Sequence, residues 1–120
     1  MLTELGLADV RDVDVQDLPY GQQRKVEIAR ALVSKPLLLL LDEPTAGMSP
    51  VERDEVFAMV RQVRARGVTV VVIEHDVRAM TENCDRLAVL HLGRILTVDV
   101  PERAIESEAV VDAYIGRTSP

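Results

Sequence analysis

Aromatic residues and cysteine are scarce in this chain. Tyrosine and phenylalanine make up 2% of its 120 residues and tryptophan is absent, so any core has to be built from aliphatic side chains. The single cysteine, Cys84, excludes an internal disulfide and fits a reducing compartment. Val77 and Met80 lie at helical spacing from it, which favours a buried structural thiol over a reactive one.

Long apolar runs are also missing. The longest, residues 37–41, is far shorter than the roughly 20 residues that span a bilayer. Met1 is not followed by the basic region and apolar stretch of a signal peptide. These absences predict a soluble, intracellular chain.

Basic residues are outnumbered, at 14 against 20 acidic ones, and the net charge is −6. Nucleic-acid-binding proteins usually need a basic face, so this balance argues against nucleic acid as a partner. It leaves a phosphate site open, because such sites often use backbone N–H groups and a metal ion instead of side-chain charge. With 48% hydrophobic residues, the chain can form one domain with a modest core.

Two apolar segments predict strands of a parallel sheet. Residues 37–41 are five consecutive leucines, and residues 68–73 are a second run of β-branched side chains. Runs this short, and apolar throughout, are typical of strands buried on both faces. A helix is expected before the first strand, from about residue 21 to residue 34, ending ahead of Pro36.

The helix between these two strands has the clearest local signals. Ser49 is a suitable N-cap, Pro50 suits the first helical position, and Glu52 completes a capping box. The apolar stripe that follows consists of Val56, Met59, Val60 and Val63.

The last third of the chain predicts a helix, a hairpin and a terminal helix. Asp76 can cap a helix that runs to Cys84, and strands at residues 87–91 and 94–98 flank a turn. The terminal helix is expected from Ser107 to Ile115, ending at Gly116. Alternating strands and helices indicate an α/β fold with a parallel sheet and an antiparallel hairpin at the end.

Charged side chains follow both predicted parallel strands. Asp42 and Glu43 come directly after the first, and residues 74–76 (Glu-His-Asp) after the second. Ligands collect at the carboxyl ends of strands in open α/β sheets. Asp42 could act on Mg²⁺ through its water shell, and Glu43 could orient or deprotonate an attacking water. An isolated Asp-Glu pair favours the simple start of a surface loop, and His75 alone could equally be a capping or packing histidine.

A further segment, residues 18–24 (Leu-Pro-Tyr-Gly-Gln-Gln-Arg), leads directly into a helix and offers unpaired N–H groups to an anion. Together with residues 26–32 (Val-Glu-Ile-Ala-Arg-Ala-Leu), it resembles the signature motif and helix of ABC-transporter ATPases. Residues 37–45 resemble their Walker B strand, residues 46–50 (Ala-Gly-Met-Ser-Pro) their D-loop, and His75 their switch histidine. Order and spacing agree from about residue 18 to residue 116.

The resemblance implies the C-terminal part of a P-loop NTPase (RecA-like) ABC ATPase domain, with ATP and Mg²⁺ as cofactors. Asp42 would then support Mg²⁺ through water, Glu43 would be the general base, and His75 would contact the γ-phosphate. The signature residues and the D-loop residue would contact ATP held by the opposing subunit; these are Tyr20, Gly21, Gln22 and Ser49.

The resemblance also implies partners, a location and a subdivision of the chain. The partners are a second ATPase subunit and transmembrane permease subunits, and the location is cytoplasmic, peripheral on the inner face of the cell membrane. Residues 1–34 would hold the end of the helical subdomain and the signature helix. Residues 35–98 would hold the Walker B, D-loop and switch-histidine region, and residues 99–120 the C-terminal helices. Three shorter motifs are similar to the subfamily of branched-chain amino-acid importers: Tyr20-Gly21, Ala46-Gly47-Met48 and Glu74-His75-Asp76.

Two departures from the family pattern affect activity. The 120 residues contain no P-loop, Gly-x4-Gly-Lys-Ser/Thr, since neither Lys25 nor Lys35 follows a glycine. We therefore expect the chain by itself to bind ATP weakly and not to hydrolyse it. The second departure is Pro19, which stands where the family usually has serine and offers neither a hydroxyl nor an N–H.

These departures leave an alternative function open. The chain could be a catalytically incomplete interaction or regulatory fragment that pairs with an intact ATPase subunit and slows it. An ABC-type ATPase of DNA repair is a further alternative, which the acidic charge disfavours.

Overall fold

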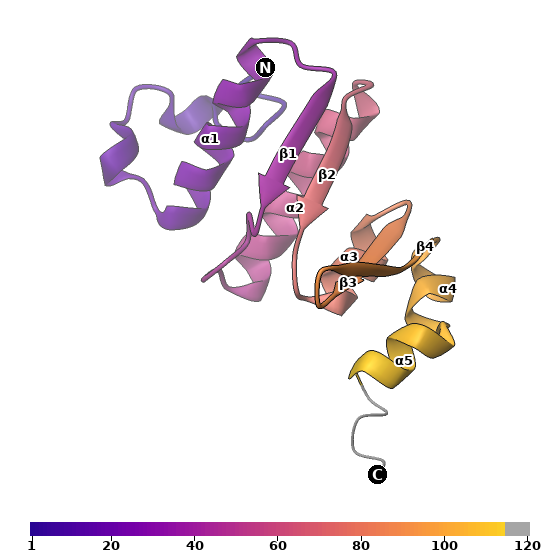
Figure 1. Cartoon of the computed structure of the whole chain (residues 1–120). Helices are drawn as coiled ribbons and strands as arrows, with labels where there is room; N and C mark the ends of the chain where they lie inside the picture. The colour runs from indigo at the N-terminus through magenta and orange to yellow at the C-terminus, as the bar shows by residue number, and fades with distance from the viewer. Residues whose placement is uncertain (115–120) are drawn as a thin grey trace. The chain divides into compact units, whose positions relative to one another are not determined.

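The computed structural model describes residues 1–114, and the expected helix end at Ile115 and Gly116 lies outside them. The chain divides into two compact units, the first from Met1 to His75 and the second beginning at Asp76. Figure 1 shows the helices and strands of both units.

The first unit starts with one helical turn. Leu7 N–H donates to the Leu2 carbonyl at 2.8 Å and Gly6 N–H to the Thr3 carbonyl at 3.2 Å, a pair of bonds that ends a helix. Gly6 has φ +71°, which glycine adopts at little cost. Two short 3₁₀ helices follow, η1 (Ala8–Val10) and η2 (Val15–Asp17).

Two helices and two strands make up the rest of the first unit. They are α1 (Tyr20–Val33), β1 (Leu38–Asp42), α2 (Pro50–Ala65) and β2 (Thr69–Ile73). The strands pair in parallel, in a register that runs from Leu38 opposite Thr69 to Asp42 opposite Ile73. The predicted parallel sheet and the helices on either side of its first strand are confirmed.

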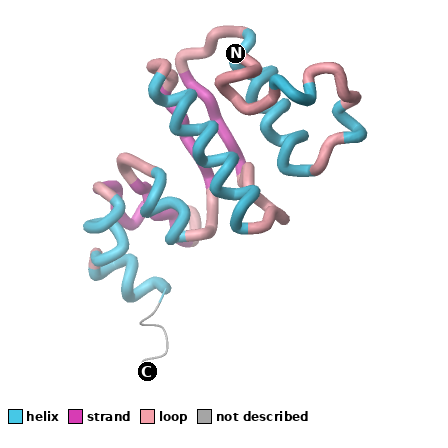
Figure 2. Tube along the Cα trace, turned by 180° about the vertical axis from the view of Figure 1, so that it is seen from behind, coloured by secondary structure: helices cyan, strands magenta, loops and turns pink. Residues whose placement is uncertain are grey.

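Helix α2 is built as its sequence predicts. Ser49 is the N-cap, and its hydroxyl accepts from the Glu52 N–H at 3.3 Å. The expected apolar stripe is buried throughout, with Val56 and Val63 fully enclosed. Figure 2 shows α2 running along the two parallel strands.

One core joins the helices to one face of the sheet. Leu39 of β1 packs in the same buried cluster as Ile28 and Leu32 of α1 and Val56 and Val63 of α2. Because side chains alternate between the faces of a strand, the residues between the buried ones point the other way.

That opposite face of the sheet is uncovered in the described residues. Leu40 is 68% exposed and its cross-strand neighbour Val71 is 47% exposed; Leu38 and Ile73 beside them are exposed as well. The prediction that both strands are buried on both faces is therefore wrong within the first unit, because α1 and α2 pack in one cluster with Leu39 of β1.

The second unit comprises α3 (Val77–Asn83), β3 (Leu87–His91), β4 (Arg94–Asp99), α4 (Pro101–Glu106) and α5 (Glu108–Tyr114). Asp76 caps α3 by accepting from the Ala79 N–H at 3.1 Å, as predicted. The hairpin is also confirmed, with a bulge between Val89 and Leu90. Helix α4 was not predicted.

Helix α5 is held to the hairpin by Tyr114, whose hydroxyl donates to the Leu90 carbonyl at 3.1 Å.

Cys84 follows α3 and is half-buried, with its Sγ 4.0 Å from the Met80 sulfur. Burial, assisted by the nearby charge of Asp85, raises the pKa of the Cys84 thiol. This supports a structural thiol beside Met80, whereas Val77 is 57% exposed and does not share its burial. Among residues 1–114, no helix is long and apolar enough to cross a membrane.

Candidate functional site

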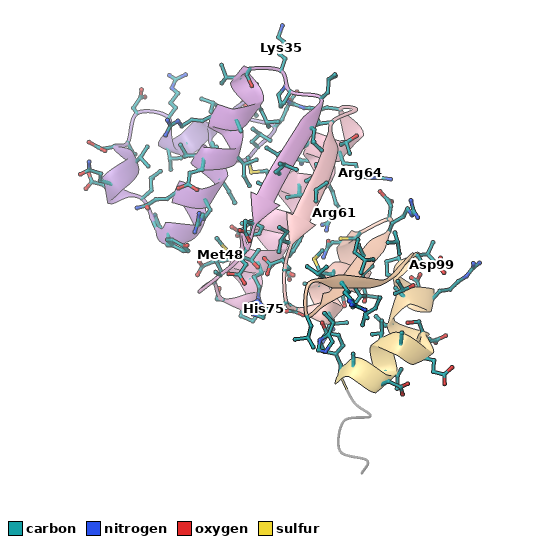
Figure 3. The ribbon with its side chains drawn as sticks, in the orientation of Figure 1. Lys35, Met48, Arg61, Arg64, His75 and Asp99 are labelled. Atoms are coloured by element: carbon teal, nitrogen blue, oxygen red, sulfur yellow. The ribbon has the colours of Figure 1, made fainter. Side chains whose placement is uncertain are left out.

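The predicted catalytic side chains lie together where β1 and β2 end. Asp42 is the last residue of β1, and Glu43 N–H donates to the Ile73 carbonyl at 2.8 Å, which extends the strand pairing by one residue. His75 follows β2, and its Nδ1 lies 3.4 Å from a carboxylate oxygen of Glu43. Figure 3 shows His75 and Met48 at this end of the first unit, and Lys35 at its other end.

Both members of the Glu43–His75 pair face solvent. The Glu43 side chain is 53% exposed and the His75 side chain 79% exposed. A carboxylate beside an imidazole, open to solvent, can accept a proton from a water molecule and orient a neighbouring polar group. The geometry therefore suits a site that acts on a ligand approaching from outside this unit.

The backbone of Glu43 is strained. Its φ is +45°, in the left-handed region that residues other than glycine, asparagine and aspartate seldom adopt. Such conformations cost free energy and persist where surrounding contacts hold them. The turn after Glu43 supplies two such contacts, from Ala46 N–H to the Glu43 carbonyl and from Met48 N–H to the Thr45 carbonyl, both at 3.2 Å.

A second contact between the two strand ends was missed by the sequence analysis. Glu74 accepts two hydrogen bonds from Thr45 on one carboxylate oxygen, at 2.6 Å from the hydroxyl and 3.1 Å from the N–H. Thr45 is only 5% exposed, and Glu74 is half-buried. The sequence placed Glu74 at this edge of the sheet but gave no sign of its partner.

Asp42 is the one predicted metal-binding residue, and it is exposed at the end of β1. Residues 1–114 contain no group of three or more His, Cys, Asp or Glu side chains that could hold a metal. Mg²⁺ usually keeps several waters and takes few protein carboxylates alongside phosphate oxygens. The single exposed carboxylate of Asp42 fits that mode of binding.

The predicted signature residues form the first turn of α1. Pro19 is its N-cap, and its carbonyl accepts from the N–H groups of Gln22 and Gln23, each at 3.0 Å. The Tyr20 hydroxyl accepts from Arg24 Nε at 2.9 Å, and the guanidinium lies 5.1 Å from the ring centre. The hydrogen bond to Tyr20, followed by that to Glu27, raises the pKa of Arg24. Arg24 thus holds the Tyr20 ring in place.

Glu52 connects the start of α1 to the start of α2. Its Oε1 accepts from the Ser49 hydroxyl at 3.1 Å, and its Oε2 would lie 3.0 Å from a Cβ added at Gly21. Lys25 and Glu55 add an ion pair between the same helices at 3.0 Å. The Glu52 side chain, bonded to Ser49, therefore lies close beside Gly21, so predicted signature and D-loop residues are near the same side chain.

Comparisons with known proteins identify the family of the chain. The ABC transporter family model matches residues 1–46. The chain is 40% identical over 116 residues to the lipopolysaccharide export system ATP-binding protein LptB of Acidithiobacillus ferridurans, covering 97% of this chain and 48% of LptB. The chain also matches a solved structure, the ADP conformation of the ATP-binding cassette MJ1267, with a TM-score of 0.85 and 32% sequence identity. The match covers 96% of this chain and 47% of MJ1267. The chain belongs to the ABC transporter ATP-binding proteins.

Other members of the family that match the chain serve a different substrate. The high-affinity branched-chain amino acid transport ATP-binding protein BraF of Pseudomonas aeruginosa is 37% identical, over 96% of this chain and 46% of BraF. The chain spans about half the length of the curated relatives that it matches. The likeness to ABC ATP-binding cassettes also confirms the predicted fold class, an α/β domain with a parallel sheet and an antiparallel hairpin.

Proposed function

We propose that this chain supplies the hydrolytic half of an ABC transporter ATPase, acting on ATP whose phosphates are held by a P-loop outside residues 1–120. The observation that carries the proposal is the Glu43–His75 contact of 3.4 Å beside Asp42, at the carboxyl edge of the parallel strands. Phosphoryl transfer needs positioning and charge neutralisation more than covalent chemistry, and these three side chains suit those tasks.

Each residue has a separate task in this proposal. Glu43 accepts a proton from the attacking water, and His75 orients groups at the γ-phosphate. Asp42 holds a water of the Mg²⁺ shell, and the bound ion would neutralise charge on the phosphates. The solvent exposure of Glu43 and His75 leaves them accessible to a nucleotide that arrives from another segment or chain.

Gly21, Gln22, Tyr20 and Ser49 are proposed to contact ATP held by an opposing ATPase subunit. The first turn of a helix presents N–H groups to an anion, and Glu52 keeps the start of α1 beside Ser49. Dividing the site between two subunits lets their closure control hydrolysis. Permease subunits would receive that motion, with the ATPase on the inner face of the membrane.

For the transported solute we propose branched-chain amino acids. The support is the set of short motifs at Tyr20-Gly21, residues 46–48 and residues 74–76, together with the similarity to BraF. The similarity to LptB supports lipopolysaccharide export as the competing solute class. Purifying the native protein with its membrane subunits and identifying those subunits distinguishes the two solute classes.

The function is tested by completing the domain. We define the completed domain as the P-loop-containing half of an intact family member such as BraF, joined ahead of residue 1. We expect it to hydrolyse ATP in a Mg²⁺-dependent manner, and either half alone to show no activity in the same phosphate-release assay. The control is a completed domain whose P-loop lysine is replaced by alanine. A well-folded completed domain that binds ATP without hydrolysing it would contradict the proposal.

A second candidate function is suggested by Pro19. This N-cap makes no side-chain hydrogen bond to α1, and the usual serine hydroxyl is missing. As a regulatory fragment, the chain would pair with an intact ATPase subunit and lower its turnover. The same assay decides, because adding the chain to an intact subunit would then reduce phosphate release while the completed domain stays inactive.

A further inference from the structure

Glu74 and Thr45 connect the two strand ends on which the proposed activity depends. Thr45 lies two residues after Glu43, and Glu74 directly precedes His75. The contact between them joins segments 29 residues apart, and it uses both polar groups that Thr45 can donate. This contact therefore joins the same two segments as the Glu43–His75 contact. On the β2 side, Glu74 is one residue closer to the strand than His75.

The contact lies in a position that can control the geometry of Glu43. Glu43 has a positive φ, so its turn does not hold its shape by local preference alone. The hydroxyl bond of 2.6 Å is within the range of hydrogen bonds to an ionised acceptor, which are shorter and stronger than neutral ones. Thr45 is buried, so water competes little for its hydroxyl.

We propose that Glu74 is a positioning residue, which acts through Thr45 to hold the Glu43 carboxylate and the His75 imidazole in their working geometry. This inference rests on the proposed function of Glu43 and His75. Glu74 itself touches neither the nucleotide nor the attacking water in this scheme. Its carboxylate is engaged with Thr45, and it sets the distance between the loops that follow β1 and β2.

The kinetic test uses the completed domain. Glu74→Ala should lower kcat between roughly tenfold and a hundredfold, because small displacements of a reacting group are costly. KM for ATP should stay within about twofold, since Glu74 does not bind nucleotide. Thr45→Val should have the same effect, Thr45→Ser should retain activity because it keeps the hydroxyl, and Glu102→Ala in α4 is the matched control.

The double variant separates positioning from general destabilisation. If Glu74 acts through Thr45, Glu74→Ala combined with Thr45→Val should cost no more than either change alone. Effects on kcat that multiply would overturn the proposal. So would a lowered melting temperature with kcat unchanged well below that temperature, because this is what a purely structural role produces.

A readout on the 120-residue chain itself does not depend on hydrolysis. The chain has two histidines, so His75 and His91 each give one set of ring signals in an NMR spectrum of histidine-labelled protein. Glu74→Ala should shift or broaden the His75 signals and leave those of His91 in place. Unchanged His75 signals would overturn the positioning role, whereas a wild-type completed domain without hydrolysis would overturn only the proposed function.

Discussion

Pro19→Ser raises the rate of ATP hydrolysis by the completed domain about tenfold or more. A hydrogen bond to a charged group contributes about 1.5–3 kcal/mol, and about 1.4 kcal/mol corresponds to a factor of ten. In the proposed function, the serine hydroxyl would supply such a bond toward the phosphate of the opposing ATP. The structure adds a second benefit, because Pro19 is the N-cap of α1 and makes no side-chain capping bond. A serine there stabilises the helix by about 1 kcal/mol.

The two benefits are separated by Pro19→Asp. Aspartate caps the helix as well as serine does, but its charge repels phosphate, so stability should rise while hydrolysis does not. Pro101→Ser, at the start of α4, is the control for a proline-to-serine change at another helix. Phosphate release and thermal unfolding are measured on all three variants. A rate for Pro19→Ser that is unchanged, or no higher than that of Pro19→Asp, would show that Pro19 does not limit hydrolysis.

The isolated chain self-associates through the uncovered face of its β1–β2 sheet, and Leu40→Thr with Val71→Thr weakens this association. Both side chains lie at the centre of that face, 68% and 47% exposed. Burying a fully exposed aliphatic side chain contributes about 1.5–3 kcal/mol, so these two partly exposed ones contribute about 2–3 kcal/mol from each of two associating copies. Threonine keeps a methyl group and loses about half of this, so the change totals about 2–3 kcal/mol per dimer. The association constant should therefore fall roughly 30- to 150-fold. Threonine is compatible with a strand, so the sheet is retained.

Sedimentation over a range of concentrations measures this association. Val33→Thr is the matched control, because Val33 is 70% exposed at the end of α1 and lies outside the sheet face. The P-loop-containing half should displace the self-association of the wild-type chain, since more than half of MJ1267 lies outside the region that this chain matches. A wild-type chain that sediments as a monomer throughout, or polar variants that associate equally, would contradict the interpretation.

Local signals in the sequence were sufficient for most of the elements. Ser49, Pro50 and Glu52 place the start of α2 because a capping box is a contact within one turn. Asp76 does the same for α3. Helix α4 was missed because it is only six residues long and its N-cap, Val100, makes no side-chain capping bond.

The contacts between segments could not be predicted in the same way. Glu74 meets Thr45 only because the register of β1 against β2 brings their ends together. Glu52 was predicted as half of a capping box, but its approach to Gly21 depends on how α1 packs against α2. Burial on both sheet faces was inferred from the apolar composition of the strands. Composition shows that a strand can be buried, but it does not show whether helices cover both of its faces.

Single-turnover hydrolysis by the completed domain with Glu43→Gln tests whether Glu43 acts in the chemical step on a nucleotide held elsewhere. Glutamine keeps the shape of the side chain and removes its ability to accept the proton from water. Because general-base catalysis contributes roughly 10²–10⁴-fold, the rate should fall by that factor while the Kd for ATP stays unchanged. The matched control is Glu102→Gln. An unchanged rate, or a rate that falls only in proportion to a loss of ATP affinity, would contradict the account.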